Sequence, residues 1–135
     1  MKCQFYSFIR FNNKKKTLFK RRLPIFRQTD AEIRKKIENI AIREVTREYS
    51  ERGFTVASVE SKNLGWDLEA VYKKIKLKIE IKGLSGQEVF VELTPNEFSK
   101  MNNNKDSYRL CVVTKCLENP ELYVFFIFPL KGMNG

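Results

Sequence analysis

The stretch WDLEAVYKKIKLKIEIK, residues 66–82, decides the fold that the sequence predicts. Apolar and polar residues alternate through both of its halves, and this period of two is typical of half-buried β-strands. We therefore expect strands over 66–72 and 74–82, joined by a two-residue turn at Lys73-Lys74. That register gives one continuous apolar face, built from the pairs Trp66 with Ile81, Leu68 with Ile79, and Ala70 with Leu77.

The same register places Asp67 directly opposite Glu80 on the polar face, and Lys82 follows on that face. Two carboxylates that face each other across a ladder are destabilising unless a cation compensates them. Mg²⁺ prefers such oxygen ligands, together with water and phosphate oxygens. A neighbouring lysine can orient a water or stabilise charge on a phosphate. The pattern predicts a site for phosphodiester hydrolysis, whereas the alternative interpretation is a solvated face that also includes Lys76 and Lys78.

The remaining periodicities predict helices and strands around this hairpin. Residues 31–52 repeat apolar side chains at helical spacing after an N-cap at Thr29 or Asp30, and a short helix follows the cap residue Thr94. The further strands are expected over 54–60, 89–93, 108–114 and 122–128. The resulting order αββββαββ predicts an α/β (α+β) domain over 31–135, with a mixed central sheet flanked by helices.

The composition of the 135 residues excludes several chemistries. There is no histidine, so histidine bases, histidine triads and histidine metal ligands are excluded. The three cysteines form no CxxC pair, which favours a reducing, cytoplasmic compartment over a disulfide framework. The longest apolar stretch, 122–130, is about half the length that a membrane-spanning helix needs.

The net charge of +10 is concentrated at the N-terminus. Residues 1–29 hold nine Lys/Arg and no acid, whereas residues 30–135 hold 17 basic and 16 acidic residues. We predict a basic arm over 1–30 that binds nucleic acid, because its cations are interleaved with Phe side chains that can stack on bases. Its candidate contacts are Lys14, Lys15, Lys16, Lys20, Arg21 and Arg22. The alternatives are a lead-in segment that packs on the core, or a targeting segment.

A third carboxylate for the site would come from the long helix. Glu38, Glu44 and Glu48 all lie within the angular range of its apolar positions, and spacing does not choose between them.

The pattern of Asp67, Glu80 and Lys82 is similar to the D…(D/E)xK signature of restriction-endonuclease-like nucleases. More narrowly, the chain resembles the domain family named after the C-terminus of the plant protein NO VEIN, which also occurs in bacterial proteins associated with restriction or phage defence. The matching stretches are IENIAIREVTREYSERGFTVASVE (37–60), NLGWDLEA (63–70), IEIKGLSG (79–86), VELTPNEFSKM (91–101) and YRLCVVT (108–114).

The resemblance implies a restriction-endonuclease-like core and a Mg²⁺-dependent nuclease in which Mn²⁺ can substitute. Asp67 and Glu80 would be metal ligands, with the carbonyl of Ile81 as an additional one. Lys82 would be the catalytic lysine and Glu38 the helix carboxylate. The implied substrate is DNA rather than RNA, cleaved in restriction or phage defence, with a helper protein or a second copy as partner. The matching LTPNE stretch, 93–97, has no assigned role and is typical of a helix cap.

Two functions of other classes fit the same sequence. A non-catalytic nucleic-acid-binding module would use the basic arm and retain binding after loss of Glu80. A protein-interaction module would keep the nuclease fold for assembly, with YVFFIF (123–128) as an edge or dimer strand. A core strand is the competing interpretation of that run.

Overall fold

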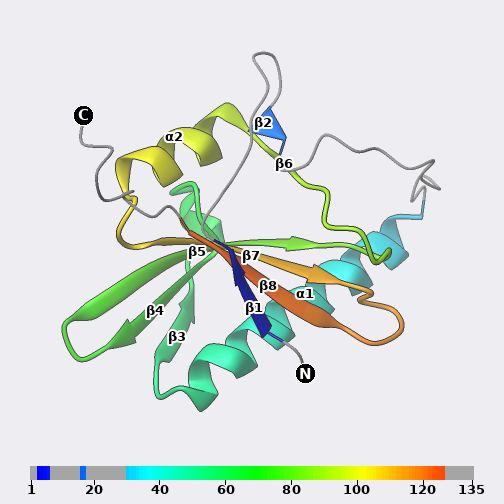
Figure 1. The fold of residues 1–135 in the computed structure, drawn as a ribbon, viewed down its shortest axis with the longest axis horizontal. Coiled ribbons are helices and arrows are strands. Elements are labelled where there is room, and N and C mark those ends of the chain that lie inside the picture. The colour runs from blue at the N-terminus through cyan, green and yellow to red at the C-terminus, as the bar shows by residue number, and fades with distance from the viewer. Residues whose placement is uncertain (1–2, 7–15, 18–29, 127–135) are drawn as a thin grey trace.

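The structure, a computed structural model, describes residues 3–6, 16–17 and 30–126 (Figure 1). Its centre is a mixed six-stranded sheet of order β1-β8-β7-β5-β4-β3. The sheet strands are β1 (Cys3–Tyr6), β3 (Thr55–Ser58), β4 (Leu68–Tyr72), β5 (Ile75–Gly83), β7 (Tyr108–Thr114) and β8 (Glu121–Phe125). The other elements are α1 (Ala31–Glu51), α2 (Pro95–Asn103), the short 3-10 helix η1 (Glu60–Lys62), and a separate strand pair of β2 (Lys16–Thr17) with β6 (Glu92–Leu93). The α+β class predicted from the sequence is confirmed.

The core consists of two clusters, one on each side of the sheet, and α1 and α2 lie on these opposite sides (Figure 1). Strand β7 is buried along its length because it contributes to both clusters. Cys111 and Val113 pack on the α1 side, whereas Leu110 and Val112 pack on the α2 side. This two-sided burial explains why the sequence of β7 is apolar without alternation.

Helix α1 begins where the Asp30 side chain accepts a hydrogen bond from the backbone N–H of Glu32, at 2.8 Å. One stripe of the helix is buried against the sheet, as the helical spacing predicts. Its buried apolar members are Ile37, Ala41, Val45 and Tyr49. This stripe fixes which face of α1 meets β5.

The register of the central hairpin is as predicted from Leu68 to Tyr72, with Leu68 opposite Ile79. Lys73, in the turn, has the positive φ of 54° that a tight two-residue connection requires. The predicted pairing of Trp66 with Ile81 is wrong, because the ladder ends at Leu68. Trp66 packs in the cluster on the α2 side, whereas Ile81 packs on the α1 side.

Other strands differ from the predicted ones in length or partner. The strand expected over 54–60 ends at Ser58, because η1 follows it. The strand expected over 89–93 is only the two residues of β6, which pairs with β2 outside the main sheet. Within the first 30 residues, where no strand was expected, β1 pairs in parallel with β8.

The run 123–128 is a core strand as far as the structure describes it, to residue 126. Strand β8 lies between β1 and β7, and Leu122, Val124 and Phe125 are buried. The interpretation as an exposed edge strand is therefore wrong. Cys111 and Cys116 are both buried. No helix among the described residues combines the length and apolar character needed to span a membrane.

The candidate nucleic-acid contacts of the basic arm, Lys14, Lys15, Lys20, Arg21 and Arg22, lie outside the described residues. The backbone of Lys16 belongs to β2. The arm therefore stays a prediction.

Candidate active site

The candidate site lies where β4 begins, at Leu68, and β5 continues past it toward its own C-terminus. Strand β5 pairs with β4 only as far as Ile79, but with β7 on its other side from Lys78 to Gly83. The last residues of β5, which include Glu80 and Lys82, therefore have a strand neighbour on one side only. Beside the start of β4, this edge of β5 has no strand partner.

Asp67 lies beside this unpaired edge of β5 and is held there by three hydrogen bonds. Its N–H donates to the Ile79 carbonyl at 2.8 Å, and its carbonyl accepts from the N–H of Val59 at 2.8 Å. Its Oδ2 accepts from the N–H of Ile81 at 2.8 Å, so the carboxylate replaces the strand partner that Ile81 lacks. Asp67 is thus not paired directly with Glu80, as the ideal register predicted, but lies beside the end of the ladder.

A pocket of about 210 Å³ opens at this point. Four carboxylate residues line it together with apolar residues of α1 and β5. The lining consists of Glu38, Ala41, Ile42, Glu60, Asp67, Glu80, Ile81 and Gly83. Three of the predicted site residues, Asp67, Glu80 and Glu38, therefore meet in one pocket with Ile81.

Gly83 explains why Glu38 is the helix carboxylate that reaches this pocket. A Cβ at Gly83 would lie 3.0 Å from the Cβ of Ala41 and 3.1 Å from the carbonyl oxygen of Ile37. Only glycine therefore lets the backbone of β5 approach α1 this closely. Glu38 lies between Ile37 and Ala41 along the helix, at the point of closest approach.

The other two candidate carboxylates of the helix, Glu44 and Glu48, do not line the pocket. Glu44 is buried and pairs with Arg47, and Glu48 pairs with Arg52. Glu38 also has a partner on the helix, the ammonium of Lys35 at 3.7 Å, but its side chain is 45% exposed. The packing of α1 thus separates three residues that helical spacing left equivalent.

Lys82 lies beside Glu80, with its Nζ 3.2 Å from Glu80 Oε2. The same nitrogen donates to both carboxylate oxygens of Glu97, at 3.0 and 3.1 Å. Three acidic oxygens from two residues therefore surround one ammonium. Lys82 itself does not line the pocket. It contacts the pocket residue Glu80.

The electrostatics of the site are those of an acidic cluster that one cation only partly neutralises. Burial raises the pKa of Glu80 to about 9, and the charges of Asp67 and Glu97 add to this effect while Lys82 opposes it. Burial also raises the pKa of Asp67, although the hydrogen bond from Ile81 opposes the shift. Both carboxylates therefore favour either a proton or an added cation.

Lys82 stays a cation in this environment. Burial by itself would lower its pKa, but the charges of Glu80 and Glu97 outweigh burial and raise the pKa. For Glu97, burial by itself would raise the pKa, but the hydrogen bond from the N–H of Thr94 and the charge of Lys82 outweigh burial and lower the pKa. Glu97 is therefore the ionised partner of Lys82, whereas Glu80 is the carboxyl that holds a proton most readily.

Glu60 and Glu97 are site residues that sequence reasoning did not assign. Glu60 lines the pocket from η1, and its charge contributes to the raised pKa of Asp67. Glu97 has a sequence signal, because Thr94 and Glu97 have the spacing of a capping box. That signal predicts the helix cap but gives no sign of the contact with Lys82, which depends on where α2 packs.

The donors at the pocket suit a hard cation such as Mg²⁺, since they are oxygens. Asp67 Oδ1 has no hydrogen-bond partner among the described residues, and Glu80 is buried beside like charges. Within the part of the chain that the structure describes, no group of three or more acidic or cysteine side chains lies close enough together to hold a metal ion by itself. A cation here would therefore take its remaining ligands from water, substrate or backbone oxygens, which is usual for Mg²⁺.

Fold and site together define an α+β domain with an acidic pocket and one lysine where a β-hairpin enters the sheet. The chain belongs to the family described as "Protein NO VEIN, C-terminal", which matches residues 37–125. That match covers β3 to β8, with most of α1, and includes every residue of the pocket. Neither the curated proteins nor the solved structures contain a significant match to the chain.

Proposed function

We propose that the protein is a metal-dependent nuclease that hydrolyses phosphodiester bonds of DNA. The observation that carries the proposal is the meeting of Asp67, Glu80 and Glu38 in one pocket, with Lys82 bound to Glu80. Buried carboxylates close together are costly unless something of opposite charge joins them. Lys82 supplies one positive charge, and the pocket still has an excess of acid.

Asp67 and Glu80 are the residues that would hold Mg²⁺ or Mn²⁺, with the Ile81 carbonyl as the proposed backbone ligand. When bound, such a cation supplies charge neutralisation at the phosphate and a lowered pKa for water. The hydrogen bonds that fix the Asp67 backbone place its carboxylate before any ligand arrives, and preorganisation of this kind avoids a later ordering cost.

Lys82 and Glu38 complete the proposed chemistry. The pKa of Lys82 is raised, so the side chain acts as a fixed positive charge toward a phosphate oxygen rather than as a general base. Glu38 enters the pocket from α1 and is half-exposed, which suits a residue that accepts a hydrogen bond from an attacking water. The role proposed for Lys82 thus uses the charged form that its surroundings favour.

The similarity of Asp67, Glu80 and Lys82 to the D…(D/E)xK signature supports placing the chain among restriction-endonuclease-like nucleases. Restriction or phage defence is the proposed setting, with a helper protein or a second copy as the proposed partner. The proposed superfamily, setting and partner rest on the resemblance, and membership of the NO VEIN C-terminal family supports them.

A nucleic-acid-binding module without catalysis is the second candidate. The charge distribution favours it, because residues 1–29 carry nine Lys/Arg and no acid while the rest of the chain is nearly neutral. Such a module would bind DNA with a steep salt dependence and would keep that binding when Glu80 is replaced.

The test is cleavage of supercoiled plasmid by the full chain with Mg²⁺ or Mn²⁺, comparing wild type with Glu80→Ala and with Lys76→Ala. Lys76 is the matched control, because it lies on the same strand but outside the pocket. We expect wild type and Lys76→Ala to nick the plasmid and Glu80→Ala to fail. Equal cleavage by all three would contradict the proposed site. Salt-sensitive binding without cleavage by wild type would favour the binding module.

A further inference from the structure

We infer that Glu97, at the start of α2, is a positioning residue that fixes where the Lys82 ammonium lies in the site; the inference rests on the proposed function. Both carboxylate oxygens of Glu97 accept hydrogen bonds from Lys82 Nζ, at 3.0 and 3.1 Å. Glu80 Oε2 lies 3.2 Å from the same nitrogen. An ammonium has three donors and no acceptor, so these oxygens match its whole donor capacity.

Glu97 can position a partner because its own carboxylate is held by the helix. Its Oε1 accepts from the N–H of Thr94 at 2.9 Å, while Thr94 Oγ1 accepts from the N–H of Glu97 at 3.1 Å. These two bonds form a capping box, and the one from the Thr94 N–H fixes the Glu97 carboxylate at the start of α2. The oxygen that caps the helix is thus one of the two that bind Lys82, which links the start of α2 to the position of the lysine.

The start of α2 also packs on the loop that leads into Asp67. Gly65 has a φ of 98°, and a Cβ there would lie 3.2 Å from Asn96 Nδ2 and 2.5 Å from Lys100 Cγ. The hydroxyl of Tyr108 donates to the Gly65 carbonyl at 3.1 Å and holds the loop from the sheet side. The first turns of α2 therefore contact both the lysine and the approach to the acidic pocket, which gives the LTPNE stretch a role beyond capping.

Without the Glu97 carboxylate, the acidic neighbours left to Lys82 are Glu80 and Asp67. Those are the proposed cation ligands, so the ammonium would compete with the cation for them. Glu97 draws two of the three lysine donors toward α2 and so leaves ligand oxygens available. Loss of Glu97 should therefore slow turnover while the surface that binds DNA is unchanged.

The experiment compares Glu97→Gln with Thr94→Val in the full chain. Glutamine keeps an oxygen for the capping box but removes the negative charge that binds Lys82. Thr94→Val keeps the backbone N–H that donates to Glu97 and removes only the hydroxyl. One measurement is the NMR signal of the Lys82 ammonium, identified by its absence in Lys82→Met. The other is the kcat and KM of plasmid cleavage with Mg²⁺.

We expect Glu97→Gln to shift or lose the Lys82 signal and to lower kcat by about 10–100-fold, with KM within about 2-fold of wild type. Thr94→Val should lower the melting temperature by a few degrees while keeping the signal and kcat. An unchanged Lys82 signal in Glu97→Gln would overturn the inference, as would an unchanged kcat or an equal loss in Thr94→Val. Absence of cleavage by wild type would refute the proposed function alone, and the Lys82 signal would still decide whether Glu97 positions the lysine.

Discussion

The two halves of β5 carry the same alternation of apolar and charged residues but lie in different surroundings. In the first half, Ile75 is 52% exposed, and the exposed Lys76 pairs with the partly buried Glu69 at 2.9 Å. In the second half, Ile79 is fully buried and Glu80 is only 4% exposed. One periodic sequence therefore gives a solvated ribbon at one end and a buried charged site at the other.

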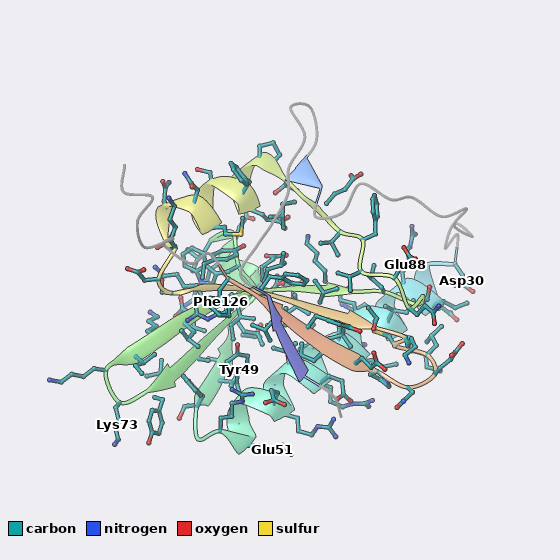
Figure 2. The ribbon with its side chains drawn as sticks, in the orientation of Figure 1. Asp30, Tyr49, Glu51, Lys73, Glu88 and Phe126 are labelled. Atoms are coloured by element: carbon teal, nitrogen blue, oxygen red, sulfur yellow. The ribbon has the colours of Figure 1, made fainter. Side chains whose placement is uncertain are left out.

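The difference arises from what flanks each half. Among the described residues, β4 is the only strand that pairs with β5 before Lys78. The hairpin therefore projects from the body of the protein (Figure 1), and Lys73 marks its tip (Figure 2). From Lys78 onward β7 pairs with β5, and α1 and α2 approach from the two sides. Alternation thus specifies which residues share a face, but the neighbouring elements decide whether that face is exposed to solvent or buried.

The largest expected effect is the difference in stability between an apolar substitution in the second half of β5 and one in the first half. Ile79→Ala should lower the free energy of unfolding by about 2–5 kcal/mol, because it leaves a cavity in a close-packed core. Ile75→Ala should cost less than about 1 kcal/mol, because that side chain is half-exposed. Urea unfolding of both variants measures the contrast, and equal losses would mean that the hairpin tip is packed against something.

The next effect is the difference in DNA cleavage rate between a lysine substitution in the second half of β5 and one in the first half. Lys82→Met should lower the rate of DNA cleavage by about 10²–10³-fold, the usual cost of removing one preorganised charge that stabilises a transition state. Lys76→Met, on the same strand, should leave the rate within about 2-fold, because its ion pair is exposed to solvent. Single-turnover kinetics with Mg²⁺ test this, and similar rates for the two variants would remove Lys82 from the mechanism.

A smaller effect is the difference in stability cost between an alanine at the end of β5 and one in the loop that follows it. Gly83→Ala should cost about 1–3 kcal/mol of stability, since its Cβ would press on Ala41 and on the Ile37 carbonyl. Gly86→Ala is the matched control, because nothing lies within 4 Å of a Cβ there, and its effect should stay within about 0.5 kcal/mol. Thermal unfolding decides between them, and a neutral Gly83→Ala would show that α1 can move away from β5.

The smallest effect is the pH dependence caused by Glu80. Its pKa of about 9 in the folded protein exceeds its ordinary value of 4.5, so folding takes up a proton between these values. The stability that this proton confers is complete below about pH 4.5 and is lost as the pH rises toward 9. Glu80→Gln cannot ionise, so it should be the more stable protein near pH 8, by about 1–2 kcal/mol.

Urea unfolding between about pH 5 and 8 without divalent cations measures this difference. Glu69→Gln is the control on the neighbouring strand and should keep the slope of the wild type. Its contacts with Lys76 and Trp66 outweigh burial and lower the pKa of that carboxylate. The same slope in wild type and Glu80→Gln would show that Glu80 does not hold the proton.

Short-range patterns determined much of the fold. Alternation predicted the hairpin and its register from Leu68 to Tyr72, and helical spacing predicted α1 after a cap at Thr29 or Asp30, of which the structure shows Asp30. These predictions held because period and capping are properties of a few neighbouring residues. The pattern failed at Trp66, where the backbone of Asp67 leaves the regular ladder and turns the preceding side chain to the other side of the sheet.

The sequence by itself determined that Asp67, Glu80 and Lys82 lie close together, because two paired strands bring them to one end of a hairpin. Only the tertiary structure decided that Glu38, rather than Glu44 or Glu48, joins them, since this depends on the close approach of α1 at Gly83. It also decided that Glu97 binds Lys82, a contact between residues 15 positions apart on different elements. Local periodicity fixes which side chains share a face, and long-range packing fixes which of those faces meet.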